Sequence, residues 1–297
     1  MVECRIKGKV LGGGRAYNPL AAGDFVAVEL EASAHALRGS IVERLPRQTA
    51  LSRWNRKRGA VQTLAANADL LLAVGSYGQP PFRPRFLDRL MLSAELGGME
   101  PVLVLNKADL PAEAATEERL RAYEALGYRW LSCSAKNGEG IAALAEVIRE
   151  AGVVAIAGQS GVGKTALLNR MDPHLQRREG ALSRKYNRGA HTTTFAELLD
   201  LAGIGCVIDT PGIRELEITG IHSRELRLWF RDLEPFVEQC SLPGCMCVEE
   251  PGCAVREAVA ARRIHPDRYE SYLRTLLEMQ DAEAEASAAG VPDQRTR

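Results

Sequence analysis

Hydrophobic and polar positions alternate in short runs over the first 60 residues. Residues 4–10 (CRIKGKV) place apolar and basic side chains on opposite sides of an extended chain, and apolar runs at Phe25–Leu30 and Ser40–Glu43 follow after Gly, Pro and Asn turns. Short strands with a basic outer face are typical of a small nucleic-acid-binding barrel of the OB type. An ordinary solvated β-module is the alternative interpretation. We predict an OB-type, RNA-binding β-domain over residues 1–60.

From residue 61 to residue 215 the pattern changes to buried strands that alternate with helices. Ala68–Val74, Pro101–Leu105 and Val153–Ala157 are continuous apolar runs of strand length, while Arg85–Leu96 repeats apolar residues at helical spacing. This alternation is typical of an α/β domain in which helices cover a parallel sheet. The fold class predicted for this part is therefore α/β.

The remaining residues predict helices around a group of cysteines. Helical spacing of apolar residues predicts helices at Ser223–Phe236 and from Pro266 to about Gln280. Residues 281–297 are rich in Ala and Glu and then polar, which predicts a frayed or disordered tail. The predicted domains are thus 1–60, 61–215, 216–280 (helical and zinc-binding) and the tail 281–297.

Composition and charge indicate which cellular compartment and which kinds of partner to expect. The 297 residues carry no formal net charge, but residues 1–60 contain eleven Lys and Arg against five Asp and Glu. Within them, residues 53–58 (RWNRKR) form a basic cluster that can bind phosphate or remain a solvated loop. The sequence contains no apolar run of membrane-spanning length and no signal peptide, so we expect a cytoplasmic protein without membrane contact. Its seven cysteines then lie in a reducing compartment, where clustered cysteines indicate a metal site.

A phosphate-binding loop follows the apolar strand at Val153–Ala157. The sequence GQSGVGKT matches G-x-x-x-x-G-K-[ST], and the next residues begin a helix. Glycines allow backbone N–H groups to point at phosphate oxygens, the lysine reaches the β- and γ-phosphates, and the threonine hydroxyl binds Mg²⁺. The predicted contacts to a nucleoside triphosphate are made by Gly158, Gln159, Ser160, Gly161, Val162, Gly163, Lys164, Thr165 and Ala166.

Two further loops at strand ends predict that the base is guanine. The tetrapeptide NKAD follows the strand Pro101–Leu105 and matches N-K-x-D, the guanine-reading motif of GTPases. Its Asp109 carboxylate accepts from guanine N1–H and the 2-amino group, donors that adenine does not present there. The tripeptide SAK ends the next predicted strand and supplies a second base loop. The predicted base contacts are Asn106, Lys107, Ala108, Asp109, Ser134, Ala135 and Lys136.

The order of these motifs is permuted relative to an ordinary GTPase. There the phosphate loop comes first and the base motifs late, whereas here both base motifs precede Gly158. Because a fold depends on contacts rather than on chain order, a circularly permuted chain can build the same site. After the phosphate loop, residues 177–191 have the place and composition of a switch I loop, and residues 206–212 (CVIDTPG) form a strand that ends in D-x-x-G.

These two segments predict the residues that contact the metal and the γ-phosphate. One threonine of residues 192–194, which we take to be Thr193, would close on Mg²⁺ and the γ-phosphate. Asp209 would hold Mg²⁺ together with Thr165, and the Gly212 N–H would contact the γ-phosphate. Ile213 occupies the position where many GTPases carry the glutamine that orients the attacking water, so we expect slow intrinsic hydrolysis.

Four cysteines in the C-terminal part have the spacing of a metal site. Cys240, Cys245, Cys247 and Cys253 follow the pattern C-x₄-C-x-C-x₅-C within one short loop. Four thiolates so close can surround Zn²⁺ tetrahedrally, and a small domain with little core needs such a metal. We predict one structural Zn²⁺; free or disulfide-forming cysteines are the alternative.

Taken in order, the motifs NKAD, SAK, GQSGVGKT, HTTT and DTPG, with a cysteine cluster ending EPGCAV, resemble the bacterial small-subunit-dependent GTPase family (RsgA/YjeQ type) over nearly the whole chain. The resemblance implies an OB barrel, a circularly permuted GTPase domain and a C-terminal zinc domain. It also implies GTP hydrolysis stimulated by the 30S subunit, binding of the GTP form to 16S rRNA, release on hydrolysis, and a role in late subunit maturation. The family's switch I gives His191 the water-positioning role that Ile213 cannot fill. We expect a monomer.

Three features depart from the family pattern. Cys247 stands where the family usually has a histidine ligand, so the zinc site is more anionic. Ala190 stands where an arginine usually precedes the switch I histidine, so one contact to phosphate or RNA is absent. Residues 4–8 resemble the family's segment after the first strands of the barrel, so either the barrel lacks those strands or it closes in another way.

Two other classes of function remain open. One is a P-loop GTPase with another partner, such as a translation or signalling GTPase, although the basic N-terminal part and the zinc site favour RNA. The other is an RNA-binding protein that holds GTP as a structural ligand without turnover. Measuring GTP hydrolysis with and without 30S subunits separates these classes.

Overall fold

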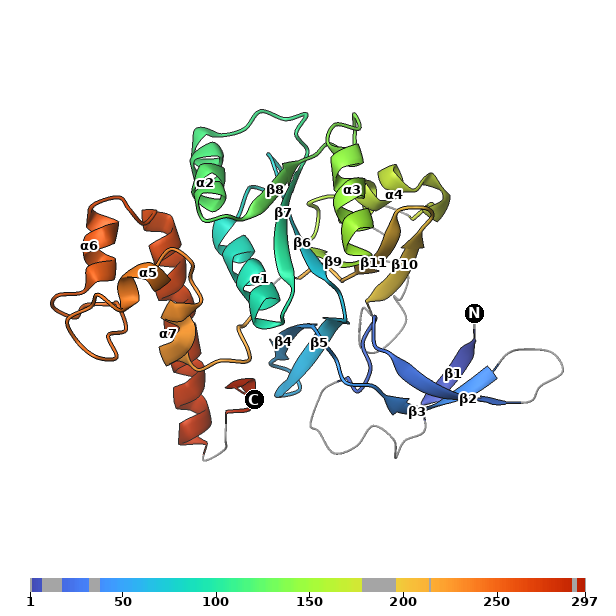
Figure 1. Ribbon diagram of the computed structural model, residues 1–297, viewed down its shortest axis with the longest axis horizontal. Coiled ribbons are helices and arrows are strands. Elements are labelled where there is room, and N and C mark those ends of the chain that lie inside the picture. Colours follow the sequence, from blue (N-terminus) through green and yellow to red (C-terminus); the bar gives the residue numbers. More distant parts are fainter. Residues whose placement is uncertain are drawn as a thin grey trace.

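A six-stranded sheet in the order β10-β11-β9-β6-β7-β8 lies at the centre of the computed structural model, which describes residues 2–6, 18–31, 38–177, 196–213, 215–289 and 293–296 (Figure 1). Strands β11, β9, β6, β7 and β8 are parallel, and β10 pairs antiparallel with β11 at the edge. The strands are β6 (Leu70–Ser76), β7 (Glu100–Asn106), β8 (Arg129–Ser132), β9 (Val153–Gly158), β10 (Glu197–Leu201) and β11 (Gly205–Asp209).

Helices cover both faces of this sheet. Because side chains alternate along each strand, Leu71 and Leu103 pack on one face with α1 and α2, while Leu72 and Val104 pack on the other with α3 and α4. Figure 1 shows these two pairs of helices on opposite sides of the strands. The helices of this domain are α1 (Pro84–Leu96), α2 (Ala114–Ala125), α3 (Ile141–Ala151), α4 (Lys164–Met171) and the 3₁₀ turn η1 (Pro173–Leu175). The predicted α/β fold is confirmed.

The N-terminal residues form strands in two sheets. β1 (Glu3–Ile6) pairs parallel with β3 (Arg38–Arg44), which pairs antiparallel with β2 (Val26–Glu31). β4 (Ala50–Asn55) and β5 (Ala60–Ala66) form a separate hairpin. Among the described residues no strand ladder joins the two sheets, so the region of the predicted barrel consists there of a sheet and a hairpin. Strand pairing continues past the predicted boundary at residue 60.

The C-terminal part packs short helices against one long helix. Its elements are η3 (Ser223–Leu228), α5 (Glu234–Val237), α6 (Ala254–Ala260), α7 (Pro266–Ala288) and η4 (Gln294–Thr296). The prediction of one continuous helix over 223–236 is wrong, because Pro235 lacks the N–H that a helix interior needs and instead lies in the first turn of α5. The predicted disordered tail is wrong for residues 281–288, which extend α7 with the strong helix formers Ala and Glu. Within the described ranges, no helix combines the length and apolarity needed to cross a bilayer.

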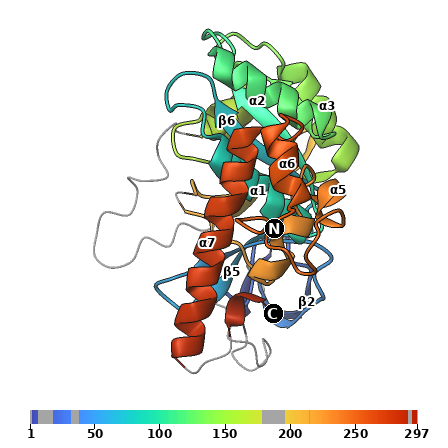
Figure 2. The same cartoon turned by 90° about the vertical axis from the view of Figure 1, so that its left-hand side faces the viewer.

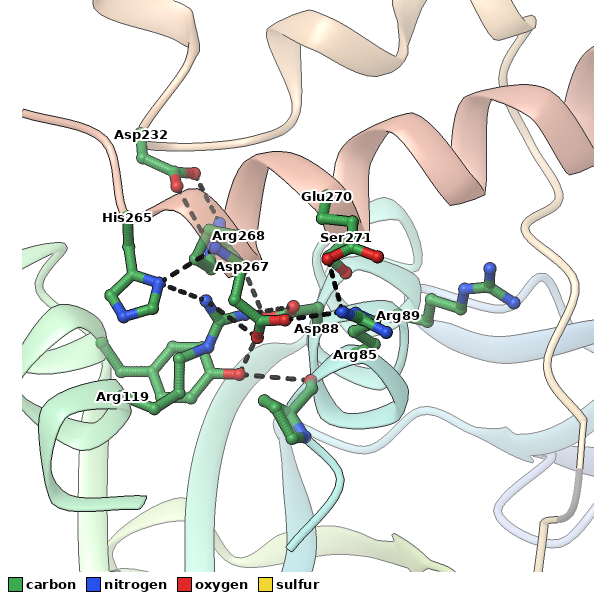
Figure 3. Close-up of polar contacts among 12 residues, drawn as sticks. Arg85, Asp88, Arg89, Arg119, Asp232, His265, Asp267, Arg268, Glu270 and Ser271 are labelled. Atoms are coloured by element: carbon green, nitrogen blue, oxygen red, sulfur yellow. Dashed lines mark hydrogen bonds and ion pairs between the residues drawn. The ribbon is translucent and has the colours of Figure 1, made fainter. Parts of the chain in front are cut away.

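A buried network of charges attaches α7 to α1 and α2 (Figure 3). The Arg268 guanidinium lies 2.8 Å from the Asp88 carboxylate and 2.7 Å from that of Asp232, and Arg119 contacts the second oxygen of Asp88 at 2.5 Å. Although burial opposes ionisation of Asp88, the two arginines lower the pKa of its carboxyl. Since removal of one partner would leave a buried charge uncompensated, we expect this joint to hold α7 firmly against the central domain.

Candidate functional site

Four strands of the central sheet end at one edge, and a predicted site segment lies at each end. β7 ends at Asn106, β9 at Gly158 and β11 at Asp209, while Ser134 lies two residues beyond β8. The carboxyl edge of a parallel sheet is where open α/β folds bind ligands. The permuted chain order therefore still brings the predicted phosphate, base and metal residues to one edge.

The loop between β9 and α4 has the backbone that a phosphate cradle requires. Gly161 and Gly163 have φ of 85° and 94°, in the left-handed region that favours glycine. A Cβ on Gly163 would lie 2.2 Å from Nδ2 of Asn106, and a Cβ on Gly158 would lie 2.3 Å from the Val74 carbonyl oxygen. Only glycine fits at Gly158 and Gly163. The glycines of the motif are therefore needed for close packing as well as for the backbone conformation of the loop.

Lys164 begins α4, and its side chain curls back over the loop. Its Nζ donates to the carbonyl oxygens of Gly158 at 2.9 Å and Gln159 at 3.3 Å. Burial lowers the pKa of the ammonium group, although the nearby Asp209 carboxylate opposes the shift. The loop thus holds a cation inside itself, where phosphate oxygens could replace the two carbonyl acceptors.

Asn106 and Lys107 tie the base loops to the phosphate loop. The buried Asn106 side chain donates from Nδ2 to the Val162 carbonyl at 2.9 Å and accepts at Oδ1 from the Ala135 N–H at 3.1 Å. Lys107 donates from Nζ to the Gly161 carbonyl at 2.9 Å. The N-K-x-D motif predicts a role for Asn106 in base binding alone; its bridging contacts depend on long-range packing that no sequence pattern indicates.

Asp109 carries a preorganised carboxylate. Ser134 donates from Oγ to Oδ1 at 2.7 Å, and the Lys136 ammonium lies 3.2 Å from Oδ2. The hydrogen bond from Ser134, with that from Lys136, lowers the pKa of the carboxyl. Asp109 is therefore an anionic acceptor at neutral pH, as recognition of two N–H donors requires.

Asp209, at the end of β11, is in the opposite situation. Its side chain is 2% exposed, and neither carboxylate oxygen has a hydrogen-bond partner among the described residues. The Arg177 guanidinium lies 3.4 Å from Oδ2 and 3.1 Å from the Glu197 carboxylate; sequence analysis did not predict this pairing. Burial raises the pKa of Asp209, and the cations Arg177 and Lys164 only partly offset it. Buried carboxylate oxygens without donors fit a hard divalent cation such as Mg²⁺ or its bound water.

The backbone after Asp209 lies against the phosphate loop. The Ile213 N–H donates to the Gly158 carbonyl at 3.3 Å, and a Cβ on Gly212 would be in van der Waals contact with Ser160 at 3.4 Å. The Ile213 side chain is 1% exposed and packs in the core beneath the sheet. It points into the protein, so it cannot position a water molecule.

Two of the predicted site residues lie outside the described residues. These are His191 and Thr193, together with the rest of the predicted switch I loop from residue 178 onward. Thr165, the other predicted metal ligand with a hydroxyl, is the second residue of α4 and half-buried. The described part of the site is therefore the phosphate loop, both base loops and the D-x-x-G segment.

The four predicted zinc ligands converge in the C-terminal part. The Sγ atoms of the cluster lie within 4.8 Å of one another, with 3.9 Å between Cys240 and Cys253 and 4.0 Å between Cys245 and Cys247. Tetrahedral zinc with Zn–S bonds of about 2.3 Å requires sulfur separations of roughly 3.8 Å, so the four positions fit such a metal. Burial raises the pKa of Cys245 to about 11, and a metal would displace the thiol proton there.

Glu250 shapes the loop that carries these cysteines. Its carboxylate accepts from the N–H groups of Met246 at 2.7 Å, Val248 at 2.8 Å and Glu249 at 3.1 Å. Although burial opposes it, these donors lower the pKa of Glu250. The Tyr269 hydroxyl of α7 donates to the Cys247 carbonyl at 2.7 Å. The cluster is thus supported by side chains outside the cysteine pattern, which sequence analysis did not identify.

Comparison with known proteins agrees with this geometry. The model of the family described as RsgA GTPase matches residues 44–219. Proteins named "Small ribosomal subunit biogenesis GTPase RsgA" are similar over 93% of this chain: that of Flavobacterium psychrophilum is 34% identical, with 86% of its length covered, and that of Chlorobaculum parvum is 36% identical, with 90% covered.

Solved structures extend the similarity to the fold. YjeQ from Thermotoga maritima is 30% identical, with a TM-score of 0.69 and coverage of 93% of this chain and 89% of that one. YloQ, described as a circularly permuted GTPase, is 28% identical, with a TM-score of 0.65 and coverage of 94% and 86%. The predicted permutation is therefore confirmed, and the chain belongs to the RsgA GTPase family and is a GTP-hydrolysing enzyme.

Proposed function

We propose that this GTPase acts in late maturation of the small ribosomal subunit, that the 30S subunit stimulates its hydrolysis, and that hydrolysis releases it. The observation that carries the proposal is the similarity over 93% of the chain to proteins named for small ribosomal subunit biogenesis. A similarity over 93% of the chain extends well beyond residues 44–219, which the family model matches. The GTP form would bind 16S rRNA as a monomer in the cytoplasm.

The nucleotide would lie across the carboxyl edge of the sheet. Guanine would contact Asp109 and the loop of Ser134, while the phosphates would lie in the loop from Gly158 to Ala166. Thr165, Thr193 and Asp209 would hold Mg²⁺, whose charge helps to neutralise the phosphates. The Gly212 N–H, which is held near Ser160, would contact the γ-phosphate.

Water would be positioned by His191. Ile213 occupies the position where many GTPases have a glutamine that orients the attacking water. Its side chain packs in the core and cannot take that role. A histidine next to the threonines of the predicted switch I could orient the attacking water once the 30S subunit is bound. Because the water would be positioned by His191 only on the ribosome, we expect slow hydrolysis without the ribosome and fast hydrolysis with it.

The cysteine cluster would hold one structural zinc ion. Its sulfur separations and its supporting hydrogen bonds favour this role over redox chemistry. Metal analysis of protein purified without chelator should find one zinc per chain, and Cys247→His should retain it, since imidazole is an equally good ligand. Absence of zinc from the unaltered protein would contradict the assignment.

GTP hydrolysis with and without purified 30S subunits tests the proposal, with 50S subunits as the matched control. We expect stimulation by 30S alone, and His191→Ala should lower the stimulated rate by about 10²- to 10³-fold while GTP and 30S binding persist. Stimulation by another partner would indicate a different GTPase role. No turnover under any condition would indicate that GTP is a structural ligand.

A further inference from the structure

The basic cluster of residues 53–58 lies at the end of β4 and in the turn of the β4–β5 hairpin, and this turn lies beside the C-terminal half of α7 (Figure 2). Gln62 of β5 accepts from the side chains of Arg53 and Asn55 at 3.2 Å, which holds these two along the sheet. Arg56 instead leaves the sheet. Its side chain is 71% exposed, and its guanidinium donates to the carboxylate of Glu217. The basic cluster is thus bound to an acidic residue 161 positions away in the chain.

Glu217 lies between two arginines from opposite ends of the chain. Its first oxygen accepts from Arg56, and the second lies 3.7 Å from the Arg295 guanidinium. Arg295 is anchored by Asp293 at 2.9 Å and lies over the ring of Trp54, 5.1 Å from its centre. The C-terminal segment therefore covers the hairpin aromatic while Glu217 neutralises the hairpin cation.

The segment that carries Glu217 comes directly from the nucleotide site. It follows Gly212, which packs against Ser160 of the phosphate loop, by five positions. Leu216 is buried in the core beneath the sheet, and Ile218 is buried in the C-terminal core. Glu217 therefore lies where the chain passes from the core of the central domain to the C-terminal core. A movement of one core relative to the other must move its carboxylate.

Two grooves meet at the Arg56–Glu217 pair. One, of about 720 Å³, extends to Gln159 of the phosphate loop; the other, of about 580 Å³, lies between the hairpin and α7. The α7 wall of the second groove is acidic, with Glu278, Asp281 and Glu285. This wall repels phosphates, so a nucleic acid is disfavoured in the second groove as it stands.

We propose that Arg56 and Trp54 form a surface for single-stranded RNA, and that Glu217 and Arg295 mask it until the segment after Gly212 moves with the nucleotide state. Arg56 binds a phosphate and the Trp54 ring stacks on a base, two contacts that bind RNA without reading its sequence. An arginine held by a carboxylate is not free to pair with phosphate, and an ion pair whose arginine faces water, as Arg56 does, can exchange that partner for a phosphate. The inference rests on the proposed function, because it supplies the link between GTP and RNA binding.

The buried joint at Asp88 explains why the change would occur at the hairpin. Arg268 and Arg119 are both 2% exposed and hold α7 to α1 and α2, whereas the Arg56 side chain is 71% exposed. Opening the buried joint would uncover uncompensated charges, while opening the Arg56–Glu217 pair releases an arginine that already faces water and leaves Glu217, whose side chain is 15% exposed, beside Arg295 at 3.7 Å. The Arg56–Glu217 pair is therefore the contact that opens at lower cost.

The test measures binding of a fluorescent uridine oligonucleotide of about 10 nucleotides, the site size of one OB-type domain, at fixed salt. The full chain is compared with GDP and with a non-hydrolysable GTP analogue. With GDP, Glu217→Gln should bind about tenfold more tightly than the unaltered protein, close to its affinity with the analogue. Glu150→Gln is the matched control, because it removes an exposed carboxylate on α3 that faces Arg129. The double variant Glu217→Gln/Arg56→Ala should lose the gain.

Either of two results with the oligonucleotide would overturn the inference. In the first, Glu217→Gln tightens oligonucleotide binding no more than Glu150→Gln does. In the second, the double variant Glu217→Gln/Arg56→Ala binds as tightly as Glu217→Gln. An effect on 30S binding without an effect on the oligonucleotide would assign the surface to a ribosomal protein instead. Nucleotide-dependent 30S binding by the unaltered protein is measured in parallel; its absence contradicts the proposed function, whereas its presence with an unresponsive Glu217→Gln contradicts only the mask.

Discussion

Two aspartates of the nucleotide site, Asp109 and Asp209, have opposite surroundings. Asp109 accepts from Ser134 and lies beside Lys136, and these contacts lower the pKa of its carboxyl. Asp209 lacks hydrogen-bond donors among the described residues, and burial raises its pKa, which Arg177 and Lys164 offset only in part. At the predicted base-binding end the carboxylate therefore has its hydrogen bonds without a ligand. At the predicted phosphate-binding end the Asp209 carboxylate has no hydrogen-bond donor in the described part of the chain, although the Arg177 guanidinium lies 3.4 Å away.

The sign of each pKa shift decides how the two ends of the site respond to pH. Asp109, with a folded-state pKa below the unfolded value, contributes stability above the unfolded pKa and loses it as pH falls. Asp209, with a folded-state pKa above the unfolded value, costs stability while ionised, and the cost disappears as pH falls through the folded pKa. Binding sites often keep such uncompensated groups at the expense of stability.

The largest expected effect comes from breaking the base-binding end at Asp109. Asp109→Asn should weaken GTP binding by about a hundredfold, because the amide cannot accept from both N–H donors of guanine. Xanthosine triphosphate should bind better than GTP to this variant, since its 2-oxo group accepts from an amide. Competition binding with the three nucleotides measures the change, and Asp200→Asn on the exposed edge strand β10 is the matched control. Equal binding of ATP and GTP by the unaltered protein would remove the basis of the assignment.

Asn106 connects the phosphate loop to the second base loop, so its replacement should destabilise both loops. Asn106→Ala leaves the Val162 carbonyl and the Ala135 N–H without their partner and should lower the free energy of unfolding by about 1–3 kcal/mol. Denaturant unfolding measures this loss. The matched control is Asn137→Ala, which removes an exposed local contact to the Glu139 N–H. If the two variants are equally stable, Asn106 is not a structural bridge.

Ser134 sharpens the comparison by changing only the surroundings of Asp109. Ser134→Ala should weaken GTP binding about threefold to tenfold, the effect of one hydrogen bond to a charged group. Without this donor the pKa of Asp109 moves back toward its usual value, so GTP affinity should begin to fall at a higher pH than in the unaltered protein. A pH series of binding measurements checks the direction; a shift to lower pH contradicts this role for Ser134.

Sequence analysis predicted the parts of the fold that depend on local pattern. Continuous apolar runs such as Ala68–Val74 predicted buried parallel strands, because a strand covered on both faces has no polar side. The prediction of a disordered tail from residue 281 is wrong as far as residue 288. Alanine and charged residues are also strong helix formers, so α7 continues through them.

Contacts between distant segments could not be predicted. The bridge from Asn106 to Val162, the pairing of Arg177 with Asp209 and the contact of Arg56 with Glu217 each depend on how separate elements pack. The motifs predicted which residues contact the nucleotide. The fold shows which of those side chains have hydrogen-bond or ionic partners within the protein.

The most direct test of this account is the stability of Asp209→Asn with and without Mg²⁺·GTP. Without ligand, we expect the variant to be more stable than the unaltered protein by about 1 kcal/mol at neutral pH, because it removes a buried charge without donors. The difference should vanish as pH falls, since protonation of Asp209 removes the same charge. Saturating Mg²⁺·GTP should then stabilise the unaltered protein, by about 2.7 kcal/mol at a hundred times its Kd, and the variant much less. A variant that is less stable without ligand, or that gains as much from Mg²⁺·GTP, would contradict the account.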